Sequence, residues 1–340
     1  MIKNNAALTL FAAALLTATF GGPQNRAEAQ DYYEGKTITI FAGRPPGGSI
    51  DSTTRLVAEY FGRHVPGNPT VLPDNRPGAG GVVLGNYIHD QAPANGLELG
   101  IPGRTSFILS PITGNDQALY TLEDFAWIGS AARSNFMLWV RGDMGINSLE
   151  ELKASGQTLV VGGSSGRNSD TIIPLMLQEA GLSLKVIAGY PGTGESRLAM
   201  ERGEIDAILT GPASFPPDFL LEGKAIAILQ TFREEPDMPI FKDVVTDPLA
   251  RGVLTLLEAP LGVGLAMIAP PGTDDATLEI LRTAYMEMVT SEEYVAAANE
   301  RGLEISDTPQ SGAEIAEFVA GVAAEITPEV LAKYLSFAQE

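Results

Sequence analysis

The sequence has 340 residues and no cysteine. This absence excludes disulfide bonds, thiolate metal sites, a cysteine nucleophile and a lipid-modified N-terminal cysteine. Histidine is almost as scarce, since His64 and His89 are the only two. Both are isolated, without carboxylates at the spacing that a metal site requires, so we expect structural histidines, no bound metal and no cofactor.

Positive charge is also in short supply. The chain carries 22 Lys and Arg against 42 Asp and Glu, a formal net charge of −20. Such a field repels nucleic acid and anionic lipid, so neither is expected as a partner. A small anionic ligand remains compatible, because charges more than about 8 Å away are largely screened at physiological salt and a closed cleft is governed by its own lining.

Long apolar runs are confined to the N-terminus. Lys3, the apolar stretch Ala6 to Phe20 and the small-residue site Ala27-Glu28-Ala29 are typical of a secretory signal peptide over residues 1–29. The stretch is shorter than the roughly 20 apolar residues that span a bilayer, which favours cleavage over a retained membrane anchor. Without a lipid-modified cysteine, the exported chain is expected to stay in the periplasm of a Gram-negative bacterium.

The whole chain has 37 glycines and 23 prolines. Most of them follow residue 29 and divide that part into short predicted strands and helices. Thr37 to Ala42 is rich in β-branched residues and predicts a strand, and apolar positions from Ile50 onward have helical spacing. The turn between them predicts an anion site, because a Gly-rich turn leading into a helix presents free backbone N–H groups and the positive end of a helix dipole. Its candidate ligand residues are Gly47, Gly48 and Ser49. Asp51 is a candidate helix cap that orders the turn or holds a water molecule beside the ligand.

The strand, Gly-rich turn and helix pattern recurs at 158–180 and 185–202. Alternating strands and helices predict an α/β fold with mainly parallel sheets, in which ligands lie at the carboxyl ends of the strands. The chain is expected to cross between two lobes near residues 130–136 and 256–262. These crossings divide it into a discontinuous first lobe, 30–133 with 257–340, and a second lobe, 134–256. A strand is expected over Leu261 to Ala269.

Three arginines follow predicted strands at such turns: Arg44, Arg104 and Arg167. A guanidinium can hold a carboxylate through two charge-assisted hydrogen bonds. Neutral donors that either bind ligand or cap helices are Thr105, Ser165, Asn168, Ser169 and Thr193.

One motif suggests catalysis. Gly162-Gly-Ser-Ser-Gly166 matches the G-x-S-x-G turn that carries the serine nucleophile of α/β-hydrolases. That fold needs its histidine after the serine, whereas both histidines of this chain precede it. The spacing of Gly78, Gly80 and Gly85 also fails to give a dinucleotide-binding pattern. We therefore expect a protein that is not an enzyme.

Five segments carry a resemblance to a known family: Phe41 to Asp51, Asn75 to Gly81, Ser164 to Gly166, Tyr190 to Gly194 and Ala269 to Thr273. In this order they resemble the extracytoplasmic solute-binding receptors of tripartite tricarboxylate transporters, also called the Bug family, from Tyr33 to the C-terminus. The resemblance implies a two-lobed fold like that of periplasmic binding proteins, which closes on a small organic carboxylate and passes it to integral-membrane transporter subunits. It adds Gly78, Ala79 and Gly194, in the second and fourth of these segments, to the ligand candidates.

The sequence thus predicts a periplasmic solute-binding receptor for a small organic anion. The alternatives are an exported hydrolase acting on a carboxylate-containing small molecule and a sensory solute receptor. The identity of the anion is left open.

Overall fold

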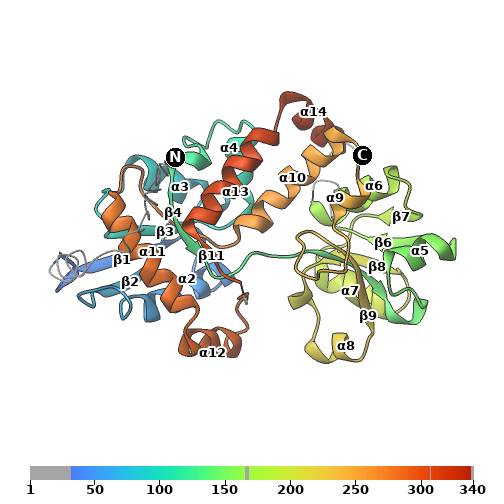
Figure 1. Ribbon diagram of the computed structural model, residues 1–340, viewed down its shortest axis with the longest axis horizontal. Helices are drawn as coiled ribbons and strands as arrows, with labels where there is room; N and C mark the ends of the chain where they lie inside the picture. The colour runs from blue at the N-terminus through green and yellow to red at the C-terminus, as the bar shows by residue number, and fades with distance from the viewer. Residues whose placement is uncertain (1–31, 165–167, 307, 338–340) are drawn as a thin grey trace, which may run out of the picture.

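The computed structural model describes residues 32–164, 168–306 and 308–337. The predicted signal peptide and the candidates Ser165 and Arg167 lie outside the described residues. The described chain forms two lobes side by side, each built on its own β-sheet with helices packed around it (Figure 1).

The first sheet has the strand order β11-β4-β10-β3-β1-β2. Strand β1 pairs in parallel with β2 and β3, whereas β10 runs antiparallel to both β3 and β4. The strands are β1 (Thr37–Ala42), β2 (Thr70–Asn75), β3 (Glu98–Ile101), β4 (Ala126–Ser130), β10 (Met267–Ala269) and β11 (Gln310–Ser311). The helices of this lobe are α2 (Ser49–Phe61), α3 (Val82–Asp90), α4 (Thr105–Ile112), α11 (Asp275–Val289), α12 (Glu292–Glu300) and α13 (Gly312–Glu325).

The second sheet has the strand order β7-β6-β8-β5-β9. Strand β6 is parallel to β7 and β8, and β5 is antiparallel to β8 and β9. The strands are β5 (Met137–Arg141), β6 (Leu159–Gly162), β7 (Leu184–Ile187), β8 (Ala207–Thr210) and β9 (Ala225–Gln230). The helices are α5 (Leu149–Ser155), α6 (Ser169–Glu179), α7 (Thr193–Glu201), α8 (Pro217–Leu221) and α9 (Phe241–Val244).

The predicted two-lobed α/β fold is confirmed, but both sheets are mixed rather than mainly parallel. Strands β5 and β10 enter their sheets after the chain has crossed from the other lobe, and the short edge strand β11 also runs antiparallel to its neighbour β4. A buried strand shows the same apolar run whichever way it points, so the sequence pattern carried no information about their direction.

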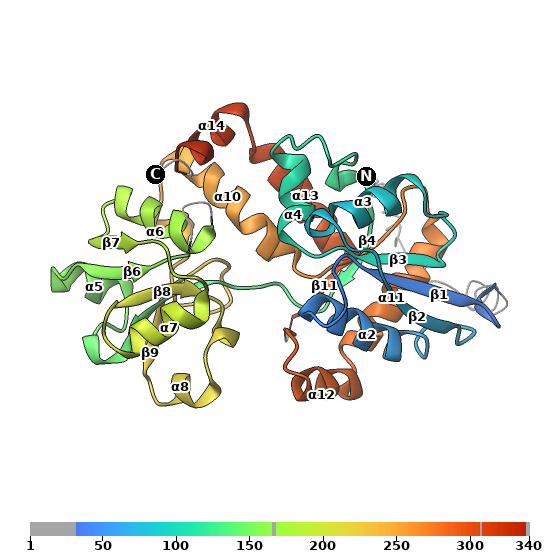
Figure 2. The same cartoon turned by 180° about the vertical axis from the view of Figure 1, so that it is seen from behind.

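The chain passes between the two sheets through two segments: residues 131–136 between β4 and β5, and the long helix α10 (Pro248–Val263). Figures 1 and 2 show α10 reaching from one lobe to the other. Val253 and Leu254 of its first half belong to the apolar core of the second lobe, whereas Ala259 and Val263 belong to a core of the first. The two connections also touch, because the Ser134 amide donates to the Leu261 carbonyl at 3.0 Å.

The strand predicted over Leu261 to Ala269 was wrong in its first half. Helix α10 continues to Val263, and only Met267 to Ala269 form a strand. A short apolar run reads the same in a buried helix and a buried strand, and α10 is buried almost all round.

The last helix, α14 (Pro328–Phe337), follows α13 at the top of Figure 1. The predicted boundaries assign residues 257–340 to the first lobe, whereas Val330 and Phe337 pack into the core of the second. The apolar spacing of a helix predicts a buried face but not the body that covers it. No helix in the described ranges is long and apolar enough to cross a membrane.

Helix α10 also carries an ionisable group in an apolar setting. Glu258 is 3% exposed, and one carboxylate oxygen lies 3.1 Å from Lys242 Nζ on α9. Its other oxygen has no hydrogen-bond partner among the described residues. Burial raises the pKa of Glu258 to about 7, with Glu325 of α13 adding to the rise and Lys242 and Arg251 opposing it.

We expect Glu258 to make the protein less stable as the pH rises toward neutrality. A carboxyl whose pKa is higher in the folded than in the unfolded state binds more protons when folded. Its contribution to the free energy of unfolding is therefore complete below about pH 4.5 and is lost as the pH rises through 7. The change is on the order of 2 kcal/mol. Denaturant unfolding of Glu258→Gln and of the parent should be measured between pH 5 and 8. The free energy of unfolding of the variant should increase relative to that of the parent as the pH rises, because glutamine does not titrate. The exposed Glu279→Gln on α11 is the control, and a stability difference independent of pH would contradict the expectation.

Candidate functional site

A cleft of about 660 Å³ lies where the lobes face each other across their two connections. Its walls are formed by the turns that follow β1, β3, β6, β7 and β8, together with the connections themselves. The residues predicted from sequence that line it are Ser49, Arg104, Thr105, Asn168, Ser169 and Thr193.

The turn after β1 reaches the cleft only through the start of α2. Gly48 is the N-cap residue of α2, and Ser49 is its first helical residue, so Ser49 does not have the capping role its residue type suggests. The side chain of Ser49 lies instead in the cleft lining with Thr53, one turn further along the helix.

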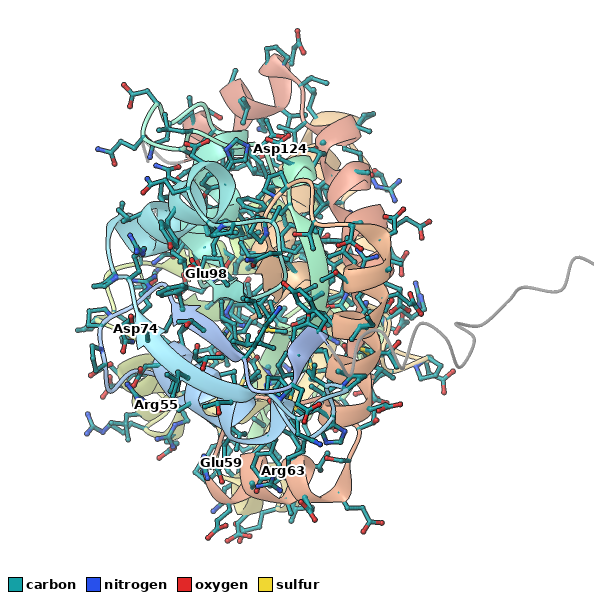
Figure 3. All side chains as sticks on the ribbon, turned by 90° about the vertical axis from the view of Figure 1, so that its left-hand side faces the viewer. Arg55, Glu59, Arg63, Asp74, Glu98 and Asp124 are labelled. Carbon is teal, nitrogen blue, oxygen red and sulfur yellow. The ribbon has the colours of Figure 1, made fainter. Side chains whose placement is uncertain are left out.

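Asp51 is buried beneath this turn and orders it. Its carboxylate accepts hydrogen bonds from the Gly47 amide at 2.9 Å, Asn75 Nδ2 at 2.8 Å and Arg55 Nε at 3.0 Å. The bond from Arg55, whose side chain lies at the surface of this lobe (Figure 3), is the largest cause that lowers the pKa of Asp51 to about 2. The Gly47 amide is therefore already engaged, and of the two roles predicted for Asp51 the geometry supports the one that orders the turn.

The glycines of the first two turns have a packing role. A Cβ on Gly43 would lie 2.3 Å from the Pro102 carbonyl oxygen, and one on Gly81 would lie 2.0 Å from the same atom. Both turns thus pack directly against the segment that leads to Arg104. Gly78 and Ala79, in the turn after β2, adopt positive φ angles of 147° and 44° and do not line the cleft.

Arg104 follows β3 and is already paired. Its Nη2 lies 2.8 Å from Glu304 Oε2, and its Nη1 donates to the Ser134 hydroxyl. The same hydroxyl donates to Glu304 Oε1 at 2.5 Å, which closes a triangle of three side chains. All three line the cleft, and the Arg104 and Glu304 side chains keep 28% and 34% of their surface exposed.

The opposing wall comes from the second lobe. Asn168 is the N-cap residue of α6, and its amide group donates to the Ser164 hydroxyl at 2.8 Å. Asp170, in the first turn of α6, accepts from the Ser164 amide and hydroxyl at 2.9 Å each. Burial raises the pKa of Asp170 above its usual value, although the hydrogen bonds from Ser164 oppose the rise. Thr193 completes this wall at the start of α7.

Several candidates do not reach the lining: Arg44, Gly47, Gly48, Asp51, Gly78, Ala79 and Gly194. Sequence reasoning missed other polar residues that do: Thr53, Ser134, Ser164, Asp170, Thr210, Ser214 and Glu304. An acid in the first turn of a helix after a Gly-rich turn is a visible signal for Asp170. Glu304 has no such signal, because it pairs with an arginine 200 positions away.

The charges of the cleft are few. Among the described lining residues the charged side chains are Arg104, Asp170 and Glu304. No group of three or more histidine, aspartate or glutamate side chains suited to a metal ion occurs within the described part of the chain. The described lining offers hydrogen-bond donors, one arginine and two carboxylates. This set suits reversible binding of a polar solute, and it contains no histidine to act as a general base for the nearby serines.

Comparison with known proteins agrees with this architecture. The sequence model of a protein family described as "Tripartite tricarboxylate transporter family receptor" matches residues 54–325. The "UPF0065 protein in gbd 5'region" of Cupriavidus necator is 26% identical over 302 residues, covering 83% of each chain.

Solved structures show the same fold. A TctC solute binding protein from Polaromonas superposes with a TM-score of 0.66 at 20% identity, covering 86% of this chain and 99% of its own. MatC from Rhodopseudomonas palustris with bound malate superposes with a TM-score of 0.52 at 17% identity, covering 87% and 99%.

The matched family and its structural neighbours are solute-binding proteins, which confirms the prediction that the chain is not an enzyme. The match extends over most of the chain, from within α2 to the end of α13, and includes the second sheet, the strands of the first sheet other than β1, and both connections. The chain therefore belongs to the tripartite tricarboxylate transporter receptor family.

Proposed function

We propose that this protein is a periplasmic receptor that captures a small organic carboxylate in the cleft between its lobes and delivers it to the membrane subunits of a tripartite tricarboxylate-type transporter. The observation that carries the proposal is Arg104, a partly exposed arginine in a cleft of about 660 Å³ that is otherwise lined mainly by small polar and apolar side chains. An arginine in such a setting suits a carboxylate, because its planar fork can form two parallel charge-assisted hydrogen bonds.

The two walls suit a shared grip on one ligand. The first lobe contributes Arg104 with the hydroxyls of Ser49 and Thr105, and the second contributes Asn168, Ser169 and Thr193. A ligand that bridges the walls stabilises the arrangement in which they are close, so binding shifts the population toward closure about residues 131–136 and α10. The malate bound to MatC, which shares this fold, is a ligand of the expected size and charge.

Delivery to a membrane partner is part of the proposal, and membership of the receptor family supports it. The predicted signal peptide supports a periplasmic site of action. A sensory receptor would use the same capture step, and only the identity of the protein that recognises the closed form separates the two roles.

Thermal unfolding against a library of mono-, di- and tricarboxylates, aromatic acids and amino acids tests the capture step. A ligand present at 100 times its Kd adds about 2.7 kcal/mol of stability, so a true ligand should raise the melting temperature clearly and in a concentration-dependent way. The same mixtures, analysed for product after prolonged incubation, test the hydrolase alternative. Binding without product supports the receptor, and either a chain indifferent to every acid or sustained turnover would contradict it.

A further inference from the structure

Arg104 is not free in the structure, and this raises the question of how a carboxylate reaches it. The guanidinium is held by Glu304 and by the Ser134 hydroxyl, and Ser134 in turn donates to Glu304. Three charged side chains line the described part of the cleft: Arg104, Glu304 and Asp170. Glu304 neutralises Arg104, and Asp170 adds a further carboxyl group. An entering carboxylate would therefore meet no unpaired cation among them.

We propose that Glu304 is a built-in carboxylate that holds Arg104 while the cleft is empty and gives it up to the carboxylate of the ligand. This inference rests on the proposed function and deepens it. Glu304 thereby sets the affinity and restricts the cleft to ligands whose anionic group competes successfully with an internal one.

The exposure of the pair makes this exchange feasible. A fully buried ion pair would be costly to break, because each charge would be left without a partner in a medium of low dielectric constant. A fully exposed ion pair would contribute almost nothing to stability, so its carboxylate would not compete with a ligand for the arginine. Arg104 and Glu304 lie between these limits with 28% and 34% of their side chains exposed, so Glu304 can recover water when it leaves.

The exchange requires movement of the Glu304 side chain alone. The backbone on either side of it is anchored, because the Leu303 amide donates to the Ala298 carbonyl at 2.9 Å and the Ser306 amide donates to the Ala131 carbonyl at 3.1 Å. The segment before Arg104 is also fixed, since glycines 43 and 81 pack tightly on Pro102. A rotation about the side-chain bonds of Glu304 is therefore enough to release Arg104.

Ser134 places the exchange at the junction between the lobes. Its hydroxyl contacts both charged partners, and its amide donates to the Leu261 carbonyl of α10, the other connection. When the ligand replaces Glu304, the Ser134 hydroxyl loses an acceptor at the segment about which closure is proposed. Release of Glu304 and closure are therefore coupled through one side chain.

The test is calorimetric titration of malate and succinate into the parent, Glu304→Gln, Arg104→Ala and the double variant, with one further variant as a control. Glu304→Gln keeps the size and hydrogen-bonding ability of the side chain but removes its charge, so it competes weakly for Arg104. We expect Glu304→Gln to bind the acids about tenfold more tightly than the parent, equivalent to about 1.4 kcal/mol. In the Arg104→Ala background the same substitution should change affinity by about twofold or less, because no arginine remains to be released.

Glu300→Gln, an exposed change of equal charge at the end of α12, is the matched control and should leave affinity unchanged. If Glu304→Gln weakens binding, Glu304 contacts the ligand directly and the inference is overturned. It is equally overturned if affinity does not change, or if the gain persists in the Arg104→Ala background, while the proposed function stands in each case because the parent binds. Failure of the parent and of Glu304→Gln to bind either acid would instead remove the proposed function for these acids and the inference with it.

Discussion

Replacing Gly81 with alanine should lower the free energy of unfolding by about 2 to 5 kcal/mol, a large share of the roughly 5 to 15 kcal/mol that stabilises an ordinary protein. Gly81 has a φ of 104°, and a Cβ there would lie 2.0 Å from the Pro102 carbonyl oxygen. The positive φ costs an alanine about 1 to 2 kcal/mol, and inserting a methyl group into a tightly packed site costs about 1 to 3 kcal/mol more. The obstructing atom belongs to the backbone, so a change of rotamer cannot relieve the contact.

Gly47 offers a matched control for this prediction. Its φ is 94°, close to that of Gly81, but a Cβ there would meet no atom within 4 Å. Gly47→Ala should therefore lose only the conformational contribution, about 1 to 2 kcal/mol. Chemical denaturation of both variants separates strain from collision, and equal losses would mean that the Pro102 segment moves aside easily.

The packing of these glycines also affects the position of Arg104 in the site. Pro102 is two residues before Arg104, and Gly43 and Gly81 both pack against its carbonyl. The Gly-rich turns of the first lobe were predicted to touch the ligand with their backbone. The structure shows instead that two of their glycines allow the turns to pack closely beneath the segment that carries the arginine. Under the proposed function, these turns would contribute to binding indirectly, through the position of Arg104.

Local sequence patterns predicted the elements whose determinants are local. Strand β1, the turn after it and helix α2 follow from a β-branched run, three glycines with two prolines, and helical apolar spacing. The turns before α6 and α7 follow in the same way, and their residues Asn168, Ser169 and Thr193 do line the cleft. Parallel β-strand and helix units place such turns at one edge of a sheet, so a local pattern could predict a shared location.

The features that escaped prediction depend on contacts between distant segments. Strands β5 and β10 enter their sheets from the other lobe, and their direction is set by the crossing rather than by their own residues. Helix α10 is buried on most of its surface because it lies in the cores of both lobes, and its last turns are an apolar run that fits a buried strand equally well. The pairing of Arg104 with Glu304 and Ser134 joins segments 30 to 200 residues apart. Nothing in the neighbourhood of Glu304 in the sequence indicates that it lies in the cleft.

Arg104→Ala is expected to weaken carboxylate binding by about 100-fold, equivalent to about 2.7 kcal/mol, while changing stability by less than about 1 kcal/mol. A hydrogen bond to a charged group contributes about 1.5 to 3 kcal/mol, and a carboxylate held by the fork would lose two of them. The effect on folding is smaller because Arg104 and Glu304 are each about a third exposed, so both can be hydrated when separated. Titration calorimetry and denaturant unfolding of the same preparation measure the two quantities.

Two further variants decide whether the fork or the charge matters. Arg104→Lys keeps the charge but not the planar pair of donors, so an intermediate loss of about tenfold is expected if the two parallel hydrogen bonds carry the affinity. Arg63→Ala removes a positive charge and an ion pair with Glu293, 3.1 Å away, at the surface beside α12 (Figure 3), and should leave binding unchanged. Parent-like binding by Arg104→Ala would move the anion to the opposite wall, where the first residues of α6 and α7 line the cleft. In that case Glu304 and Arg104 would be a structural pair at the junction of the lobes, and affinity would depend on closure alone.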